Sequence, residues 1–498
     1  MSKTVLRIVF AATLLFSLAD QIPLRNTRWV EDEGWYGDAG KTFLEEGRLR
    51  LASFPPRDTF NHADTRPPAM SWALALSFKL FGVGLWQARL PSYLARTGAI
   101  LLIFLLGVRY AGLLAGVLAA ALLLSDNYLF VASRTVRPEA LVTCLFVLTL
   151  WLYHQARERK SLLYTFLASL AATAAMAFHV IGFGAVLALG VLLLIELRFS
   201  VWKSARAWCY ALTVLAAIGA FALWIHSDQD HIAAYRALYV ERGTAPLSEK
   251  LQGEVSRYMD FVGFSNQRTP LPVNIPLRGH IALAIAAAFL ILWRFDRTAT
   301  IDLAVSVLVT LLWLTFQINK TARYLSLCTP MFALVIALAA VALMHKTKWK
   351  RAAGWAVAIV LVSQLAGNAL LLYSFRNADY RTVSEQLRAA IPPGKSAYGL
   401  TTFWLALHDR RYFAYDRAPF DYALPALQPD YLILNDRVMM HGSGRGIDDF
   451  QELREQANAF ASLHATLVAT IPSPFYGTLA VYHVCYNGGA VRDCAATP

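Results

Sequence analysis

The sequence predicts an α-helical polytopic membrane protein that carries a soluble α/β domain at its C-terminus. Hydrophobic residues make up 57% of the 498 residues and charged residues only 16%, whereas soluble domains average about 45–50% and about 25% respectively. Long apolar runs fill residues 1–373, while residues 374–498 have the composition of an ordinary soluble domain. We therefore expect a membrane domain followed by one domain in water.

Eleven apolar runs are predicted to cross the membrane, since one crossing takes about 20 apolar residues. They cover residues 1–19, 88–108, 111–131, 138–154, 161–178, 182–197, 207–225, 280–295, 300–318, 323–345 and 352–373. Residues 69–82 are also apolar but too short for a crossing, and we interpret them as an interfacial helix. The first run, which begins with Lys3 and Arg7, also fits a cleavable signal peptide; both interpretations place residue 20 outside.

Basic residues between the apolar runs predict the orientation of the chain. With the N-terminus inside, the clusters at 109, 157–160, 198–206, 294–297 and 346–351 all fall on the cytoplasmic side, as the positive-inside rule requires. This explains the net charge of +13 without a nucleic-acid partner, which would require Lys and Arg on one folded face. The parity of the crossings then places four segments outside: the loop 20–87, the turn around 126–137, the loop 226–279 and the domain 374–498. In a bacterial inner membrane this side is the periplasm.

The C-terminal domain is predicted to be a small α/β unit. Helical patterns cover 379–390 and 448–460, and short apolar runs typical of strands cover 396–400, 430–435, 464–471 and 478–484. Cys485 and Cys494 are the candidates for a disulfide, which would require an oxidising compartment.

An acidic segment in the first outer loop supplies candidate catalytic carboxylates. Residues 30–40 read VEDEGWYGDAG and contain Glu31, Asp32, Glu33, Tyr36 and Asp38. Consecutive carboxylates repel one another and usually lie in water or face a cation, so a solvated acidic loop is one interpretation. The other is a general base at the membrane surface, beside a carboxylate that raises its pKa or holds a partner or metal.

Three further outer segments supply cations at the membrane boundary. They contain Arg66 before a Pro-Pro step, Arg134 and Arg137 with Glu139, and Lys320 with Arg323 and Tyr324. Such groups can anchor lipid headgroups by snorkelling, but arginines that face outward beside a carboxylate also suit a phosphate. Because parity places all of them on the side of the acidic segment, we expect carboxylates and phosphate-binding cations to share one outer face.

The order of these motifs resembles the GT-C membrane glycosyltransferases, most closely the ArnT-like and protein mannosyltransferase-like group of glycosyltransferase families 39 and 83. The matching motifs are an Asp-Glu pair followed by an aromatic, a Pro-Pro step before a helix ending in LFG, ARLPS at 88–92, an R..RPE turn and a late K…RY…P turn. The resemblance covers most of residues 1–345. It implies a GT-C fold, a polyprenyl-phosphate-sugar donor, transfer outside the cytoplasm and inversion at the anomeric carbon.

The resemblance also implies roles for individual residues. Asp32 matches the catalytic Asp of the family and Glu33 its neighbour. The late turn with Lys320, Arg323 and Tyr324 matches the one that contacts the donor phosphate. Arg66 stands where relatives have His or Lys, which keeps a cation there but argues against metal binding at that point, although the family allows a divalent metal near Asp32.

The expected reaction is the transfer of a sugar to an acceptor hydroxyl of lipid A in lipopolysaccharide, of another cell-envelope glycan or of a protein. A transporter or flippase for a lipid-linked sugar is the main alternative, because it would also need cations near a lipid phosphate. Transporters usually place ionisable residues near the midplane and contain paired repeats, and neither pattern is evident. A structural or sensory membrane protein whose C-terminal domain binds a partner is the other alternative.

Overall fold

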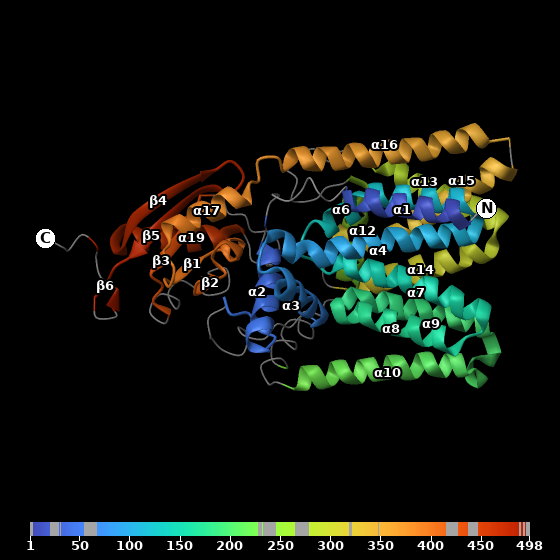
Figure 1. Ribbon diagram of the computed structural model, residues 1–498, viewed down its shortest axis with the longest axis horizontal. Helices are drawn as coiled ribbons and strands as arrows, with labels where there is room; N and C mark the ends of the chain where they lie inside the picture. Colours follow the sequence, from blue (N-terminus) through green and yellow to red (C-terminus); the bar gives the residue numbers. More distant parts are fainter. Residues whose placement is uncertain are drawn as a thin grey trace.

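A computed structural model of the protein consists of a bundle of long helices with a sheet domain at one end (Figure 1). It describes residues 3–19, 29, 31–53, 67–227, 232, 246–263, 278–317, 321–346, 348–414, 427–436, 447–487, 490–491 and 494. The N-terminus lies at the end of the bundle away from the sheet domain (Figure 1).

Helices occupy all eleven predicted crossings. The bundle comprises α1 (Lys3–Ala19), α4 (Leu85–Ala111), α5 (Leu113–Ser125), α6 (Asn127–Ser133), α7 (Glu139–Arg159), α8 (Leu162–Phe178), α9 (Phe183–Leu197), α10 (Ala205–His226), α13 (Gly279–Phe295), α14 (Arg297–Phe316), α15 (Thr329–Lys346) and α16 (Lys350–Ser374). By length and composition, six spans among the described residues can cross a membrane, or seven if the bent pair α5–α6 is one span. Shorter apolar helices cover 7–19, 69–81, 162–178, 279–295 and 329–345.

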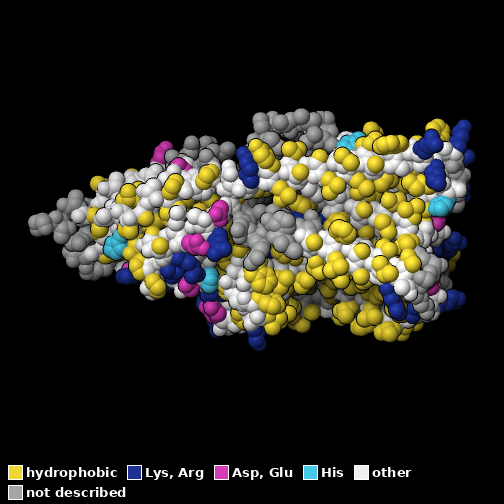
Figure 2. Space-filling view, turned by 45° about the horizontal axis from the view of Figure 1, so that its top comes forward, with side chains coloured by type: hydrophobic (Ala, Val, Ile, Leu, Met, Phe, Trp, Pro, Cys, Tyr) yellow, Lys and Arg dark blue, Asp and Glu magenta, His cyan; other side chains and the backbone are white. Residues whose placement is uncertain are grey.

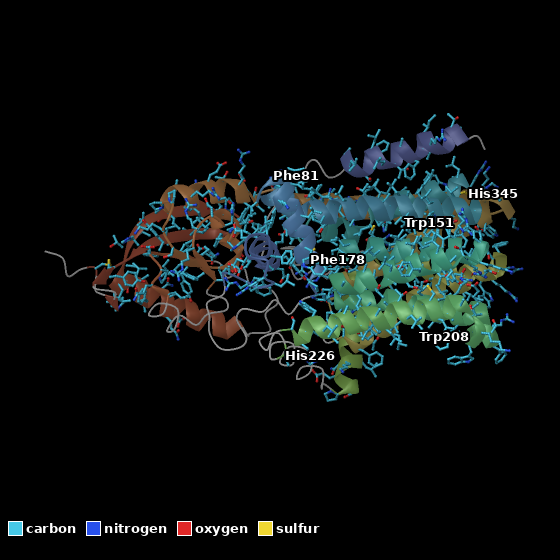
Figure 3. The ribbon with its side chains drawn as sticks, turned by 60° about the horizontal axis from the view of Figure 1, so that its bottom comes forward. Phe81, Trp151, Phe178, Trp208, His226 and His345 are labelled. Carbon is cyan, nitrogen blue, oxygen red and sulfur yellow. A yellow bond between two sulfur atoms is a disulfide. The ribbon has the colours of Figure 1, made fainter. Side chains whose placement is uncertain are left out.

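Successive membrane helices alternate in direction. Phe178 and His226, at the ends of α8 and α10, lie towards the sheet domain, whereas Trp208 and His345 lie towards the opposite end (Figure 3). Figure 2 shows Lys and Arg side chains along that opposite end of the bundle. Most of the helix surface between the two ends is hydrophobic (Figure 2), as expected for a surface in contact with lipid.

Glycine and proline fix several helix boundaries. Gly82 and Gly112 follow α3 (Ala69–Phe81) and α4 with φ values of 79° and 84°, which an L side chain rarely adopts. Pro68 and Pro138 immediately precede the first residues of α3 and α7, where the missing proline N–H costs no helix hydrogen bond. The helix α3 confirms the helical prediction for 69–82 and lies at the end of the bundle beside the sheet domain (Figure 1).

The predicted crossing over 111–131 is a broken span. It bends by 63° between α5 and α6, and the Asp126 side chain begins α6 by accepting a hydrogen bond from the Leu129 N–H at 2.8 Å. The Asn127 amide donates to Asn368 Oδ1 of α16 at 2.7 Å. Polar groups thus replace helix hydrogen bonds that the bend removes, and α6 leads into the turn that carries Arg134.

The two long loops 20–87 and 226–279 contain helices that periodicity did not predict. The acidic segment belongs to α2 (Glu31–Glu46), which is packed against the rest of the protein, so the interpretation of this segment as a solvated loop is wrong. The loop 226–279 contains α12 (Leu247–Gly263). The late turn forms the 3-10 helix η6 (Ala322–Leu327), so the crossing predicted to start at 323 begins at Thr329 instead.

The C-terminal domain is a mixed five-stranded sheet in the order β2-β1-β3-β5-β4. The strands are β1 (Ala397–Gly399), β2 (Tyr412–Ala414), β3 (Tyr431–Asn435), β4 (Ala465–Ser473) and β5 (Gly477–Val484), followed by the short β6 (Tyr486–Asn487) and β7 (Ala490–Val491). Strand β1 is parallel to β2 and β3, and β5 is antiparallel to β3 and β4. With α17 (Tyr380–Ala390) and α19 (Ile447–His464), this confirms the α/β prediction. Cys485 and Cys494 form a disulfide.

Candidate active site

The helix α2 presents its described carboxylates to different surroundings. Glu33 and Asp38 are buried, with 0% and 1% of their surface exposed, whereas the Asp32 side chain is 18% exposed. Successive helical residues point in directions about 100° apart, so neighbours in the acidic run do not share an environment. Burial therefore separates carboxylates that the sequence leaves equivalent.

Glu33 is held in a fully buried ion pair. Its two oxygens accept hydrogen bonds from Nε and Nη2 of Arg89 in α4 at 2.9 and 3.0 Å. The backbone N–H of Val136 donates to the same carboxylate at 3.0 Å. Glu33 thereby joins α2 to α4 and to the turn between α6 and α7, which gives its carboxylate a place in the packing of these elements.

Asp38 and Tyr36 also belong to the packing of α2. The Asp38 carboxylate accepts hydrogen bonds from the Ser53 N–H at 2.9 Å and the Ser53 hydroxyl at 2.6 Å. Burial nevertheless raises the pKa of Asp38 to about 6, because the loss of water outweighs these hydrogen bonds. Tyr36, one turn beyond Asp32, is 7% exposed and lies in the main hydrophobic core.

Asp32 faces two arginines that come from different parts of the chain. Arg137, from the turn before α7, forms an ion pair with Asp32, and Arg323 Nη1, from η6, lies 3.9 Å from Asp32 Oδ2. Both arginines also contact Glu139 at the start of α7, at 3.2 Å from Arg137 and 3.3 Å from Arg323. The structure thus brings three predicted outer segments together in one cluster of two carboxylates and two guanidinium groups.

The four side chains of this cluster, Asp32, Arg137, Glu139 and Arg323, differ in their exposure to solvent. The Glu139 side chain is 1% exposed and that of Arg137 is 8% exposed, whereas those of Asp32 and Arg323 are 18% and 27% exposed. Glu139 is therefore the inner anion that holds both guanidinium groups in place. Asp32 and Arg323 form the edge at which an incoming molecule can make contact.

Two other predicted site residues are buried and contact aromatic rings or imidazole. The guanidinium carbon of Arg134 lies 3.5 Å from the centroid of the Phe130 ring in α6, within the range of a cation–π contact, and Arg134 is 7% exposed. The Tyr324 ring is 6% exposed and its centroid is 5.5 Å from that of His179. Arg66 and Lys320 lie outside the described residues.

Sequence reasoning did not assign roles to Arg89 and His179. Arg89 lies at the start of an apolar run, where an arginine needs a buried partner. The sequence therefore implies a carboxylate partner for Arg89 but does not identify it. His179 packs on Tyr324 and accepts a hydrogen bond from the Ile181 N–H at 3.2 Å, a placement that only the tertiary fold specifies.

The described residues do not fit a divalent metal beside Asp32. A metal site needs several carboxylate or imidazole ligands directed at one point, and within the described ranges no group of three His, Cys, Asp or Glu side chains has that arrangement. The carboxylates of Asp32 and Glu139 are instead contacted by Arg137 and Arg323. Two guanidinium groups thus stand between the carboxylates that would have to share an ion.

Comparison with known proteins gives one family match and two curated relatives. The profile of the dolichyl-phosphate-mannose-protein mannosyltransferase family matches residues 65–224. Two uncharacterized proteins of Aquifex aeolicus (strain VF5) are similar: one is 28% identical over 152 residues, the other 32% identical over 136 residues. These matches cover 30% and 26% of this chain and 30% and 32% of the relatives, so the chain spans about a third of their length.

Solved structures match over nearly the whole chain. ArnT from Cupriavidus metallidurans in the apo state is 15% identical with a TM-score of 0.61, covering 97% of this chain and 99% of ArnT. The same protein bound to undecaprenyl phosphate is 14% identical with a TM-score of 0.60 and the same coverage. The oligosaccharyltransferase AglB from Archaeoglobus fulgidus, in complex with an inhibitory peptide and a dolichol-phosphate, is 12% identical with a TM-score of 0.55, covering 99% of this chain and 75% of AglB. The chain therefore has the fold of the GT-C superfamily of membrane glycosyltransferases, as the order of its motifs predicts.

Proposed function

We propose that the protein is an inverting glycosyltransferase that moves a sugar from a polyprenyl-phosphate donor to an acceptor hydroxyl. One observation carries this proposal: Asp32, at the accessible edge of the cluster, meets two arginines from separate outer segments. A carboxylate and two cations are what this reaction needs, because it must remove one proton and release one phosphate.

Asp32 is proposed as the general base. It takes the proton of the acceptor hydroxyl while the acceptor oxygen attacks the anomeric carbon. The bond from that carbon to the phosphate oxygen breaks, and its electron pair leaves with the polyprenyl phosphate. A single displacement of this kind inverts the configuration of the sugar.

Arg137 and Arg323 are proposed to neutralise the departing phosphate. A guanidinium group can bind two oxygens of a phosphate at once, and preorganised cations stabilise the negative charge that develops on the leaving group. Glu139, buried between them, keeps both groups oriented before the donor arrives. Donor phosphate then competes with Asp32 for the same two cations, which frees the carboxylate to accept a proton only when the donor is present.

The donor class is supported by the relatives. The similar structures include ArnT bound to undecaprenyl phosphate and AglB in complex with a dolichol-phosphate, and both of these ligands are polyprenyl phosphates. Arg66, Lys320, Arg134 and Tyr324 are proposed as further contacts to the donor phosphate.

The proposed location is the periplasmic face of a bacterial inner membrane. The positive-inside rule assigns the basic end of the bundle to the cytoplasm, and the sheet domain lies at the opposite end (Figure 1). The disulfide between Cys485 and Cys494 supports the same side, because disulfides persist in the oxidising periplasm. The proposed acceptors there are lipid A, another cell-envelope glycan or a protein.

Reconstituted protein tests this proposal. The purified protein is reconstituted in vesicles with sugars linked to undecaprenyl phosphate. On addition of an envelope acceptor, undecaprenyl phosphate should be released. NMR of the product should show an inverted anomeric centre. Mass spectrometry of envelopes with and without the protein identifies the acceptor as the molecule that lacks one sugar unit. Movement of the intact lipid-linked sugar between leaflets, without release of undecaprenyl phosphate, would instead establish the flippase alternative.

A further inference from the structure

The C-terminal domain packs directly on the helix that carries Asp32. In Figure 1, α2 lies between the bundle and the sheet domain. The contact on the domain side is made by residues 401–407, which form two short 3-10 helices, η7 (Thr401–Phe403) and η8 (Leu405–Leu407), with Trp404 between them. We infer that this domain is a positioning element of the active site, which holds the first turns of α2 so that Asp32 meets Arg137 and Arg323; this inference rests on the proposed function.

Two glycines of α2 allow this close approach. A Cβ atom at Gly34 would collide with the backbone carbonyl oxygen of Thr401. A Cβ atom at Gly37 would lie 2.7 Å from Cζ3 of the Trp404 ring, a separation that carbon atoms do not adopt without one of them moving. Gly34 and Gly37 are three residues apart and therefore lie on one face of the helix, about half a turn and about one and a half turns after Asp32.

Hydrogen bonds join the same surfaces and bracket α2 at both ends. The Trp35 indole N–H donates to the Thr401 hydroxyl at 3.1 Å. Before the helix, the Trp29 N–H donates to the Tyr476 hydroxyl at 2.8 Å, and this hydroxyl donates to the Trp29 carbonyl at 3.2 Å. After the helix, the Ala414 N–H donates to the Ser53 carbonyl at 2.8 Å.

The contacting segment is itself fixed within the C-terminal domain. The hydroxyl of the fully buried Tyr380, in α17, donates to the Thr402 carbonyl at 2.7 Å. Arg388 Nε, also in α17, donates to the Ala406 carbonyl at 2.7 Å. Because these hydrogen bonds fix residues 401–407 within the C-terminal domain, the position of the domain determines the position of α2.

Misplacement of Asp32 should slow transfer and leave donor binding intact. A catalytic group displaced by about 1 Å can cost about 100-fold in rate, whereas the donor phosphate is bound by arginines that do not belong to α2. A contact that merely stabilised the fold would change melting temperature and donor binding together. The two readouts therefore separate a positioning role from a general structural one.

The experiment is a suppressor test in the full-length protein. Gly37→Ala adds one methyl group against Trp404, and the double variant with Trp404→Leu removes the ring atoms that this methyl meets. Gly219→Ala is the matched control, because a Cβ at this helical glycine of α10 meets nothing within 4 Å. Each variant is measured for melting temperature, for binding of undecaprenyl phosphate and for sugar transfer.

We expect Gly37→Ala to lose about 100-fold in kcat with undecaprenyl phosphate binding unchanged, and the double variant to regain at least about 10-fold of that loss. Gly219→Ala should transfer at the wild-type rate. Wild-type kcat in Gly37→Ala, loss of donor binding along with transfer in the folded variant, or no recovery in a folded double variant would overturn the inference.

Thr401→Ala is a second test that introduces no clash. It removes the hydrogen bond from Trp35 and the side-chain contact with Gly34, so we expect a lower kcat with unchanged undecaprenyl phosphate binding. Unchanged kcat would count against the positioning role even if Gly37→Ala does not fold. Absence of transfer by the wild-type protein would refute the proposed function itself, a result that none of these contact variants can mimic.

Discussion

The buried pair between Glu33 and Arg89 makes a quantitative prediction for Glu33→Gln. The substitution leaves the Arg89 guanidinium, which is 1% exposed, without its counter-charge, and removing one partner of a buried ion pair costs about 3–5 kcal/mol. We therefore expect the free energy of unfolding to fall by that amount and the melting temperature to fall by several degrees. Because the pair joins α2 to α4, transfer should also decline.

A double-mutant cycle separates this structural effect from chemistry. Glu33→Leu combined with Arg89→Met replaces the pair with apolar groups of similar size, an exchange that is often neutral for stability, so the double variant should melt near the wild-type temperature and above either single variant. Circular dichroism in detergent gives the melting temperatures of the wild-type protein, the single variants Glu33→Leu and Arg89→Met, and the double variant. Glu33→Gln is measured in the same way. A Glu33→Gln protein of wild-type stability that has lost transfer would refute the positioning role and make Glu33 a chemical participant.

Three further predictions concern the cluster and its surroundings. Arg323→Lys keeps the charge but loses the planar group that contacts Asp32 and Glu139, so transfer kinetics should show a decrease of about 100-fold in kcat in a protein of unchanged melting temperature. Because the folded-state pKa of Asp38 is about 6, above its unfolded value of about 3.9, its contribution to stability is fully present below about pH 4 and is lost as pH rises through 6. This lowers the free energy of unfolding by up to roughly 3 kcal/mol, and melting curves from pH 4 to 7 should show the decrease. If the melting temperature of Asp38→Asn fell with pH as steeply as that of the wild-type protein, this assignment would be contradicted. Treatment with EDTA should not change the transfer rate, and elemental analysis should find no stoichiometric divalent metal; a rate restored only by added metal would contradict the role given to the two arginines.

Periodicity and charge predicted most of the membrane domain. Apolar runs and basic clusters depend on composition within one segment, and this is why the helices, the helical stretch at 69–81 and the α/β pattern after residue 374 agree with the structure. The break at Asp126 was not predictable, because Asn368 of α16, which accepts a hydrogen bond from Asn127, is more than 200 residues away in the chain.

The candidate site was predictable as a set of segments but not as a geometry. Parity placed the acidic segment, the Arg137 turn and the Arg323 turn on one face, and the structure brings them into contact. The sequence does not distinguish Asp32 from Glu33 or Asp38, because their difference arises from burial against Arg89 and Ser53. The packing of the C-terminal domain on α2 was also not predictable from the sequence. The glycines of α2 indicate a close contact but do not identify the segment that makes it.

The measurement that tests the central claim most directly is single-turnover transfer by Asp32→Asn, compared with Glu45→Gln. Both changes neutralise a carboxylate of α2, but the Glu45 side chain is 55% exposed and pairs with Lys41 instead of the cluster. We predict that Asp32→Asn binds undecaprenyl phosphate and transfers almost no sugar, while Glu45→Gln transfers at the wild-type rate. Wild-type transfer by Asp32→Asn would contradict the assignment of Asp32 as the base.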